Sequence, residues 1–233
     1  MGLGPILALA GPDCEGIGSG AFAQPANTLS STAFLLAGLC ILARSRRISG
    51  RRIELAVFGL AVAGNAVGGL LYHGIRSEVA TWVHDEAILA VLVFAVVFAL
   101  ARFRGWPTPA TVAAFVATLA GSGALIALVP ASSYAMFAAL GVGAGAWEMG
   151  EYRHELPAIR AQGLSPRRAA RLGVAAVAVL AATAFSLGRT GAELCRPESA
   201  FQWHAVWHVL AAVAMALYAY AAIEPHAGQD RTG

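Results

Sequence analysis

Two histidines four residues apart, His204 and His208, stand in the segment FQWHAVWHVL at the start of an apolar run. On a helix this spacing places both imidazoles on one face, one turn apart, where they can hold a single metal ion. His73 ends an earlier apolar segment, and Asp85 lies near the start of the next one. These residue types predict a metal site assembled from separate helices.

Three histidines and an open fourth position are typical of a catalytic zinc site, because neutral imidazoles leave the ion its full charge and able to acidify bound water. Asp85 would accept a proton from that water or orient a ligand imidazole. His84 competes with His73 as the third ligand, although on a helix it would point about 100° away from Asp85. The sequence contains no GxSxG, no Walker-type glycine loop and no CxxC, so other chemistries have less support.

The elements that would position these residues have the composition of a membrane protein. Of the 233 residues, 58% are hydrophobic and 12% are charged, whereas a soluble domain carries about 25% charged residues. Apolar runs of roughly the 17–25 residues that cross a bilayer predict an all-α bundle of seven transmembrane helices, at 27–43, 53–72, 83–101, 110–129, 132–147, 170–187 and 203–223. The fourth and fifth runs are separated only by a short turn at Pro130, so one long kinked helix is the alternative.

The basic residues orient this bundle. All 16 are arginine, and all except Arg76, Arg189 and Arg196 fall on one side of a seven-span topology. By the positive-inside rule the C-terminus is cytoplasmic and the N-terminus is outside. The candidate metal site then lies at the outer ends of its helices. If the fourth and fifth runs formed one helix, the arginines between the fifth and sixth runs would lie on the opposite side of the membrane from those of the two earlier basic loops. The charge bias disfavours this arrangement.

The sequence therefore divides into an outer segment with an acidic cysteine motif (1–26), a seven-span domain (27–223) and a cytoplasmic tail (224–233). We expect a multi-pass membrane protein, in the inner or plasma membrane if the chain is bacterial, with its active site toward the outer side. Basic residues do not alternate with aromatic ones on a polar surface, so nucleic acid is not an expected partner. No pattern indicates an oligomeric state.

In the outer segment, Asp13 and Glu15 flank Cys14. Two carboxylates in a flexible loop suit a hard cation such as calcium, and a solvated loop is the alternative. Cys14 and Cys195 share the oxidising outer side, where a disulfide and two free thiols are both open, while Cys40 lies within the first predicted span.

Four motifs together resemble the alkaline ceramidase family: NTLSS at 27–31, YHG at 72–74, HDE at 84–86 and WHAVWH at 203–208. That family belongs to a superfamily of seven-span membrane hydrolases that includes the adiponectin-type receptors. The resemblance covers nearly the whole chain. It implies a zinc-dependent hydrolase of a lipid amide, such as ceramide, that releases a fatty acid and a sphingoid base.

The resemblance also implies a role for individual residues. The implied zinc ligands are His73, His204 and His208. Asp85 would assist the catalytic water. The implied calcium ligands are Asp13, Glu15 and Gln24. A disulfide would join Cys14 to Cys195.

Two positions depart from the family pattern. Gly69 stands one turn before His73, where relatives usually carry a serine whose hydroxyl stabilises the oxyanion; losing one such donor costs about 2.7–4 kcal/mol of transition-state stabilisation. Gln24 stands where a carboxylate is expected. Ser30 and Asn65 are candidate replacement donors to the oxyanion, and hydrogen bonding between helices is the alternative role for both.

Two further functions remain open. The chain would be a receptor-like or lipid-binding protein with structural zinc if Gly69 marks lost catalysis. It would be a zinc esterase or phospholipase if the lipid is an ester. Release of fatty acid from N-acyl and O-acyl lipids separates these functions.

Overall fold

The computed structural model describes residues 12–48 and 50–223, and this part of the chain is helical, without a β-sheet. Its helices, in chain order, are α2 (Pro25–Ser30), α3 (Thr32–Ser45), α4 (Arg52–Gly74), α5 (Glu78–Arg104), α6 (Thr108–Leu128), α7 (Ser132–Gln162), α8 (Pro166–Leu187), α9 (Trp203–Tyr218) and the π-helical turn η1 (Ala219–Ile223). The predicted tail at 224–233 and positions 1–11 of the predicted outer segment lie outside the described residues.

Local sequence signals set the ends of several helices. At the start of α5 the Ser77 hydroxyl accepts a hydrogen bond from Ala80 N, an amide that has no partner within the helix. Gly105 ends α5 with a φ of 66°, a left-handed conformation that glycine adopts without steric cost. Ser165 caps α8 in the same way as Ser77, and Pro166 occupies the first helical position.

Within residues 12–48 and 50–223, six helical segments are long and apolar enough to cross a membrane, which indicates a multi-pass membrane protein. They are Pro25–Ser45, Arg52–Gly74, Glu78–Arg104, Thr108–Leu128, Pro166–Leu187 and Trp203–Ile223. The remaining predicted span, 132–147, is the first part of α7, which continues through charged residues to Gln162 and is not among the six. The all-helical membrane class is confirmed, and the seventh crossing stays a prediction.

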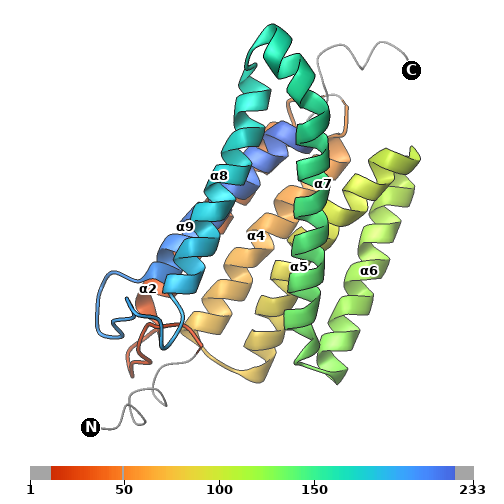
Figure 1. The fold of residues 1–233 in the computed structure, drawn as a ribbon. Coiled ribbons are helices and arrows are strands. Elements are labelled where there is room, and N and C mark those ends of the chain that lie inside the picture. The colour runs from red at the N-terminus through yellow and green to blue at the C-terminus, as the bar shows by residue number, and fades with distance from the viewer. Residues whose placement is uncertain (1–11, 49, 224–233) are drawn as a thin grey trace.

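Helices α6 and α7 are separate. Leu128 ends α6 and Ser132 begins α7, with Pro130 in the turn between them. Proline removes a backbone donor and clashes with the preceding turn, which favours a break at this point. Figure 1 shows that the chain reverses direction here, so that α7 runs back beside α5. The alternative of one long kinked helix is wrong.

Apolar side chains of α3, α4, α5, α6 and η1 form the main core. At its centre Phe58 of α4 packs on Phe94 of α5, with ring centroids 5.0 Å apart. Helix α3 approaches α4 closely at Gly38, where a Cβ atom would lie 2.7 Å from Gly59 O. Small residues permit such close approach of helix backbones in membranes. This contact fixes α3, and with it α2, against α4.

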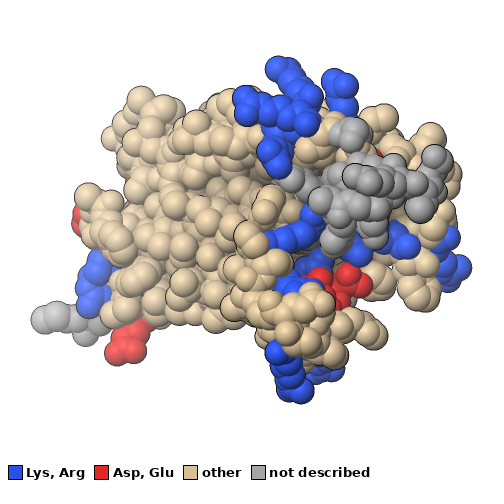
Figure 2. Space-filling view, turned by 90° about the horizontal axis from the view of Figure 1, so that it is seen from above, with Lys and Arg blue, Asp and Glu red and all other residues tan. Residues whose placement is uncertain are grey.

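The two ends of the bundle differ in charge. The end at which α4 finishes and α9 begins also carries the N-terminal segment and the loop between α8 and α9 (Figure 1). Figure 2 views the opposite end, where basic side chains gather beside a small acidic group. At this end of α8, Arg171 is 7% exposed and lies against three carboxylates of α7, those of Glu148, Glu151 and Glu155.

Candidate metal centre

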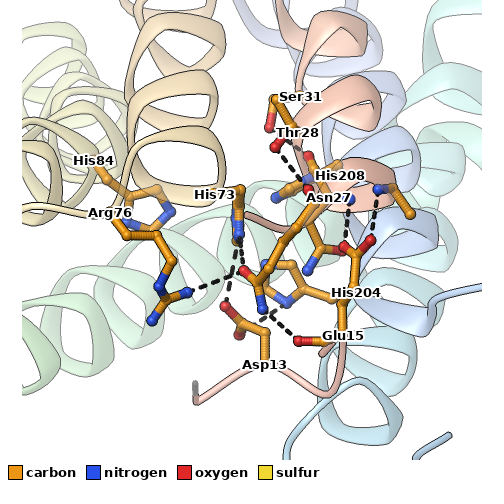
Figure 3. A network of polar contacts seen from close by, with 12 residues as sticks. Asp13, Glu15, Asn27, Thr28, Ser31, His73, Arg76, His84, His204 and His208 are labelled. Carbon is orange, nitrogen blue, oxygen red and sulfur yellow. Dashed lines mark hydrogen bonds and ion pairs between the residues drawn. The ribbon is translucent and has the colours of Figure 1, made fainter. Parts of the chain in front are cut away.

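Three histidines from two helices meet at the end of the bundle that carries the N-terminal segment (Figure 3). His73 lies in the last turn of α4, and His204 and His208 lie in the first two turns of α9. One ring nitrogen of each lies within 4.8 Å of the others, and none of the three residues is more than 3% exposed. The structure thus brings together the three residues expected to bind zinc, although they are far apart in the sequence.

Acceptor groups around two of the rings determine which nitrogen carries the proton. His73 Nδ1 lies 2.8 Å from Gln24 Oε1, an amide oxygen that can only accept. His208 Nδ1 lies 2.7 Å from Ser30 Oγ, whose own proton is donated to the carbonyl of Asn27. Both histidines therefore donate from Nδ1 and keep a lone pair on Nε2 for another partner.

His204 has a carboxylate beside the corresponding nitrogen. Its Nδ1 lies 3.3 Å from Asp13 Oδ1, an electrostatic contact without the alignment of a hydrogen bond. The Nε2 atoms of His204 and His73 are buried and have no hydrogen-bond partner in the described part of the chain. Buried polar atoms are seldom left unpaired, and a zinc ion would satisfy both. In zinc sites, an oxygen atom commonly accepts a hydrogen bond from the ring nitrogen that does not bind the metal, and this contact orients the imidazole.

The segment that carries Asp13 is fixed on both sides. Cys14 and Cys195 form a disulfide, which is the pairing that the resemblance implied. Asp13 is 2% exposed, and its Oδ1 accepts a hydrogen bond from Arg189 Nη1 at 3.2 Å. Burial raises the pKa of Asp13, and the guanidinium of Arg189 opposes this rise. Together these contacts hold the Asp13 carboxylate against His204.

The three side chains expected to bind calcium contact protein groups. Both carboxylate oxygens of Glu15 accept hydrogen bonds from backbone amides at the start of α2, at 2.7 and 2.8 Å. Gln24 Oε1 accepts hydrogen bonds from His73 and Arg76. Asp13 pairs with an arginine, as described above. All three side chains thus have protein partners, and calcium binding by them stays a prediction.

Asp85 of α5 is linked to the histidine group through its neighbour. Its Oδ1 lies 3.0 Å from His84 Nδ1, so the two side chains meet instead of diverging as expected from their helical spacing. His84 also stacks on Tyr72 at 4.4 Å and meets the edge of His73 at 5.8 Å between ring centroids. The three-histidine group does not include His84. His84 therefore connects Asp85 to His73, and His73 is the third member of the histidine group.

The two candidate oxyanion donors have other partners. Asn65 Nδ2 donates to Ala61 O at 3.0 Å and to Ala87 O at 2.9 Å, so both of its protons are used and it links α4 to α5. Ser30 uses its proton on a backbone carbonyl and its oxygen on His208. Asn65 therefore joins two helices, and Ser30 contacts the imidazole of His208, so in this structure neither residue has a free proton to offer an oxyanion.

Sequence reasoning missed two residues beside the histidines, Asn27 and Ser31, which are both 0% exposed (Figure 3). Their spacing of four in NTLSS was a signal, because it places both side chains on one helix face. What they face was not readable from the sequence. A Cβ atom on Gly69 would overlap Ser31 Oγ, and that relation exists only once α3 and α4 have packed.

The fold and the site define a class: a multi-pass helical membrane protein with a buried three-histidine group at one end of its bundle. Comparison of the chain with protein-family models and with curated proteins finds no match. The resemblance to alkaline ceramidases therefore rests on sequence motifs alone, and an activity has to be argued from the site.

Proposed function

We propose that this chain is a zinc-dependent membrane hydrolase of a lipid amide, similar to a ceramidase. The observation that carries the proposal is the group of three buried histidines. Each of its rings has an oxygen atom of another residue beside Nδ1, and two of its Nε2 atoms are buried without a partner in the described residues. This donor set fits one zinc ion held by His73, His204 and His208.

The donor set favours a catalytic site over a structural one. Among the described residues, no further histidine, cysteine or carboxylate joins the three histidines. A structural zinc site is closed by four protein ligands, whereas a catalytic site keeps one position for water or substrate. When bound, zinc would polarise the amide carbonyl and lower the pKa of the attacking water.

The proposed mechanism needs a group that moves protons, and the sequence motif points to Asp85. Asp85 is linked to the histidines through His84, which contacts both Asp85 and His73. We assign Asp85 as the general base that takes the proton of the attacking water and then delivers it to the leaving amine. His84 fixes the direction of the carboxylate through its Nδ1 contact, and Tyr72 holds the His84 ring by stacking.

The surroundings of the site favour a lipid substrate. An apolar groove of about 350 Å³ runs along α9, lined by Ser30, Phe201, Val206, Val209, Leu210 and their neighbours. Ser30 is also the partner of His208, so the groove ends one side chain away from the histidines. An acyl chain in this groove would bring its amide to the depth of the metal. In the proposed topology α7 provides a seventh crossing and the site faces the outer side, as the arginine distribution favours.

The test is the release of fatty acid from a panel of N-acyl and O-acyl lipids by purified protein. We expect release from N-acyl sphingoid bases by the unmutated chain, and little from Asp85→Asn. Glu78→Gln, on the first turn of the same helix, is the matched control and should keep full activity. Release from O-acyl lipids alone would show an esterase. No release from any lipid above the level of Asp85→Asn would reject the hydrolase and favour a binding protein with structural zinc.

A further inference from the structure

Ser31 lies at the junction of α2 and α3 and fills space that Gly69 leaves open on α4. A Cβ atom at Gly69 would overlap Ser31 Oγ and would lie 2.8 Å from Ser31 Cβ. Only a glycine at this position allows the serine hydroxyl to lie directly against the backbone of α4. The two residues are therefore sterically complementary.

This contact places the Ser31 hydroxyl beside a proposed zinc ligand. Gly69 precedes His73 by four residues, which is one helical turn. Helical side chains lean toward the N-terminal end of their helix, so the ring of His73 covers the surface of the turn that contains Gly69. Ser31 Oγ reaches the same surface from α2, and the side chain is fully buried there.

The Ser31 hydroxyl can turn to a new acceptor without leaving its present acceptor unpaired. Ser31 Oγ donates to Asn27 O at 2.8 Å, but that carbonyl also accepts from Ser31 N at 3.2 Å and from Ser30 Oγ at 3.0 Å. A carbonyl oxygen has two lone pairs, so three donors compete for it. If the Ser31 hydroxyl turns away, the carbonyl still has two partners.

The side chain of Asn27, one turn from Ser31 on the same helix face, has unused donors as well. Both Nδ2 and Oδ1 are buried and have no hydrogen-bond partner in the part of the chain that the structure describes. Leaving a buried amide unpaired is costly, and such a group is explained when a ligand or a water completes it. Asn27 and Ser31 thus form a polar wall of the histidine group with free hydrogen-bonding capacity.

We infer, on the basis of the proposed hydrolase function, that Ser31 supplies the hydrogen bond that stabilises the oxyanion and that the Asn27 amide is the second donor. In amide hydrolysis, water adds to the carbonyl carbon and the carbonyl oxygen becomes the oxyanion. Collapse of this intermediate breaks the C–N bond, the amine leaves with a proton, and a fatty acid remains. Donors aimed at the oxyanion stabilise the charge that develops in that step.

The first experiment removes the hydroxyl. Ser31→Ala should lower kcat by about 100- to 1,000-fold, the range for one oxyanion donor, with KM and zinc content unchanged. Ser186→Ala is the matched control, because Ser186 Oγ makes the same type of bond to a carbonyl four residues earlier, at 2.9 Å, on α8. That variant should keep its activity. A purely structural role for Ser31 would lower stability and leave kcat within threefold of the unmutated chain, which would overturn the inference.

The second experiment uses the complementarity of Ser31 and Gly69. Gly69→Ser alone should lower both the unfolding temperature and kcat, because its Cβ overlaps Ser31. Combining Gly69→Ser with Ser31→Gly should recover the unfolding temperature and part of kcat, since a hydroxyl again lies between the two helices. A double variant no more stable and no more active than Gly69→Ser would contradict this arrangement.

The third experiment does not depend on turnover. A long-chain phosphonate, whose anionic oxygens mimic the oxyanion, is titrated into the zinc-loaded protein by calorimetry. Ser31→Ala should weaken its binding at least tenfold relative to the unmutated chain and to Ser186→Ala. Equal binding would overturn the role of Ser31 and leave the hydrolase proposal intact. If the unmutated protein neither binds the phosphonate nor releases fatty acid, the hydrolase proposal fails, and the inference about Ser31 fails with it.

Discussion

Gln24 Oε1 lies 2.8 Å from His73 Nδ1, and the same amide donates from Nε2 to Glu15 O at 2.7 Å. Gln24 therefore fixes the tautomer of a proposed zinc ligand and is itself held in one orientation. A carboxylate at this position would keep the acceptor for His73 but would lose the donor to Glu15. The glutamine that departs from the ceramidase pattern thus has a defined structural role here.

Gln24→Leu should weaken zinc binding by about 10- to 100-fold, the usual effect of removing a group that orients a ligand imidazole. The side chain keeps its volume, so the fold should be retained. Zinc affinity is measured by competition with a chromophoric chelator. Gln162→Leu, at the far end of α7, serves as the control. Equal zinc affinity in the two variants would show that Gln24 does not orient His73.

A second prediction concerns the disulfide between Cys14 and Cys195. Cys14→Ser should lower the free energy of unfolding by about 2–4 kcal/mol, the typical value of a disulfide, and should make zinc easier to remove because Asp13 is released from His204. Cys40→Ser changes a free cysteine and should do neither. Thermal unfolding and the rate of zinc loss to a chelator are the measurements. Identical behaviour of the two variants would show that the N-terminal segment is not needed at the site.

Asn27→Leu separates a structural role from a binding role. The buried Asn27 amide has no hydrogen-bond partner in the described part of the chain, so its removal should leave the unfolding temperature unchanged or raise it. Turnover should fall, because the second oxyanion donor is lost. A lower unfolding temperature together with unchanged turnover would show that the Asn27 side chain has a structural partner and no part in the chemistry.

Arg171→Met tests how α7 is attached to α8. Its guanidinium donates a hydrogen bond to Glu155 and forms ion pairs with Glu148 and Glu151, all on α7. A hydrogen bond to a charged group contributes about 1.5–3 kcal/mol. The variant should unfold at a lower temperature and keep its zinc, because the pairs lie at the opposite end of the bundle. Arg168→Met, one turn away, is the control, because the half-buried Arg168 bonds a backbone carbonyl, that of Gly163. If Arg171→Met lost zinc while its unfolding temperature stayed unchanged, the ion pairs would affect the histidine group and not the attachment of α7, contrary to this prediction.

The membrane class and most helices were predictable because burial in lipid requires long apolar segments, and arginine positions separated the two ends. The extent of α7 was not predictable, because Glu148 and the charged residues after it end the apolar run without ending the helix. Apolarity predicts what lies in the membrane, whereas helix formation continues wherever backbone hydrogen bonds are retained.

The grouping of His204 and His208 was predictable from residue type and spacing, since the two share a helix face, whereas their binding of a metal stays a prediction. The contacts of the acidic segment were not predictable. Asp13 and Glu15 suggested calcium because of their oxygen atoms, the resemblance added Gln24, and calcium binding stays a prediction. That Asp13 and Gln24 contact histidines could be seen only in the packed structure. The spacing of Asn27 and Ser31 was visible, but the surroundings of Ser31 were not, because its position depends on the absence of a side chain at Gly69 on another helix.

The central claim is tested most directly by fatty-acid release from an N-acyl sphingoid base as zinc is returned to chelator-treated protein. Activity should be absent without metal and should saturate at about one zinc per chain, as expected for a single three-histidine site. His208→Ala should not recover at any zinc level, whereas His154→Ala, at the other end of the bundle, should recover fully. Release that persists without zinc, or that never appears with it, would contradict the account.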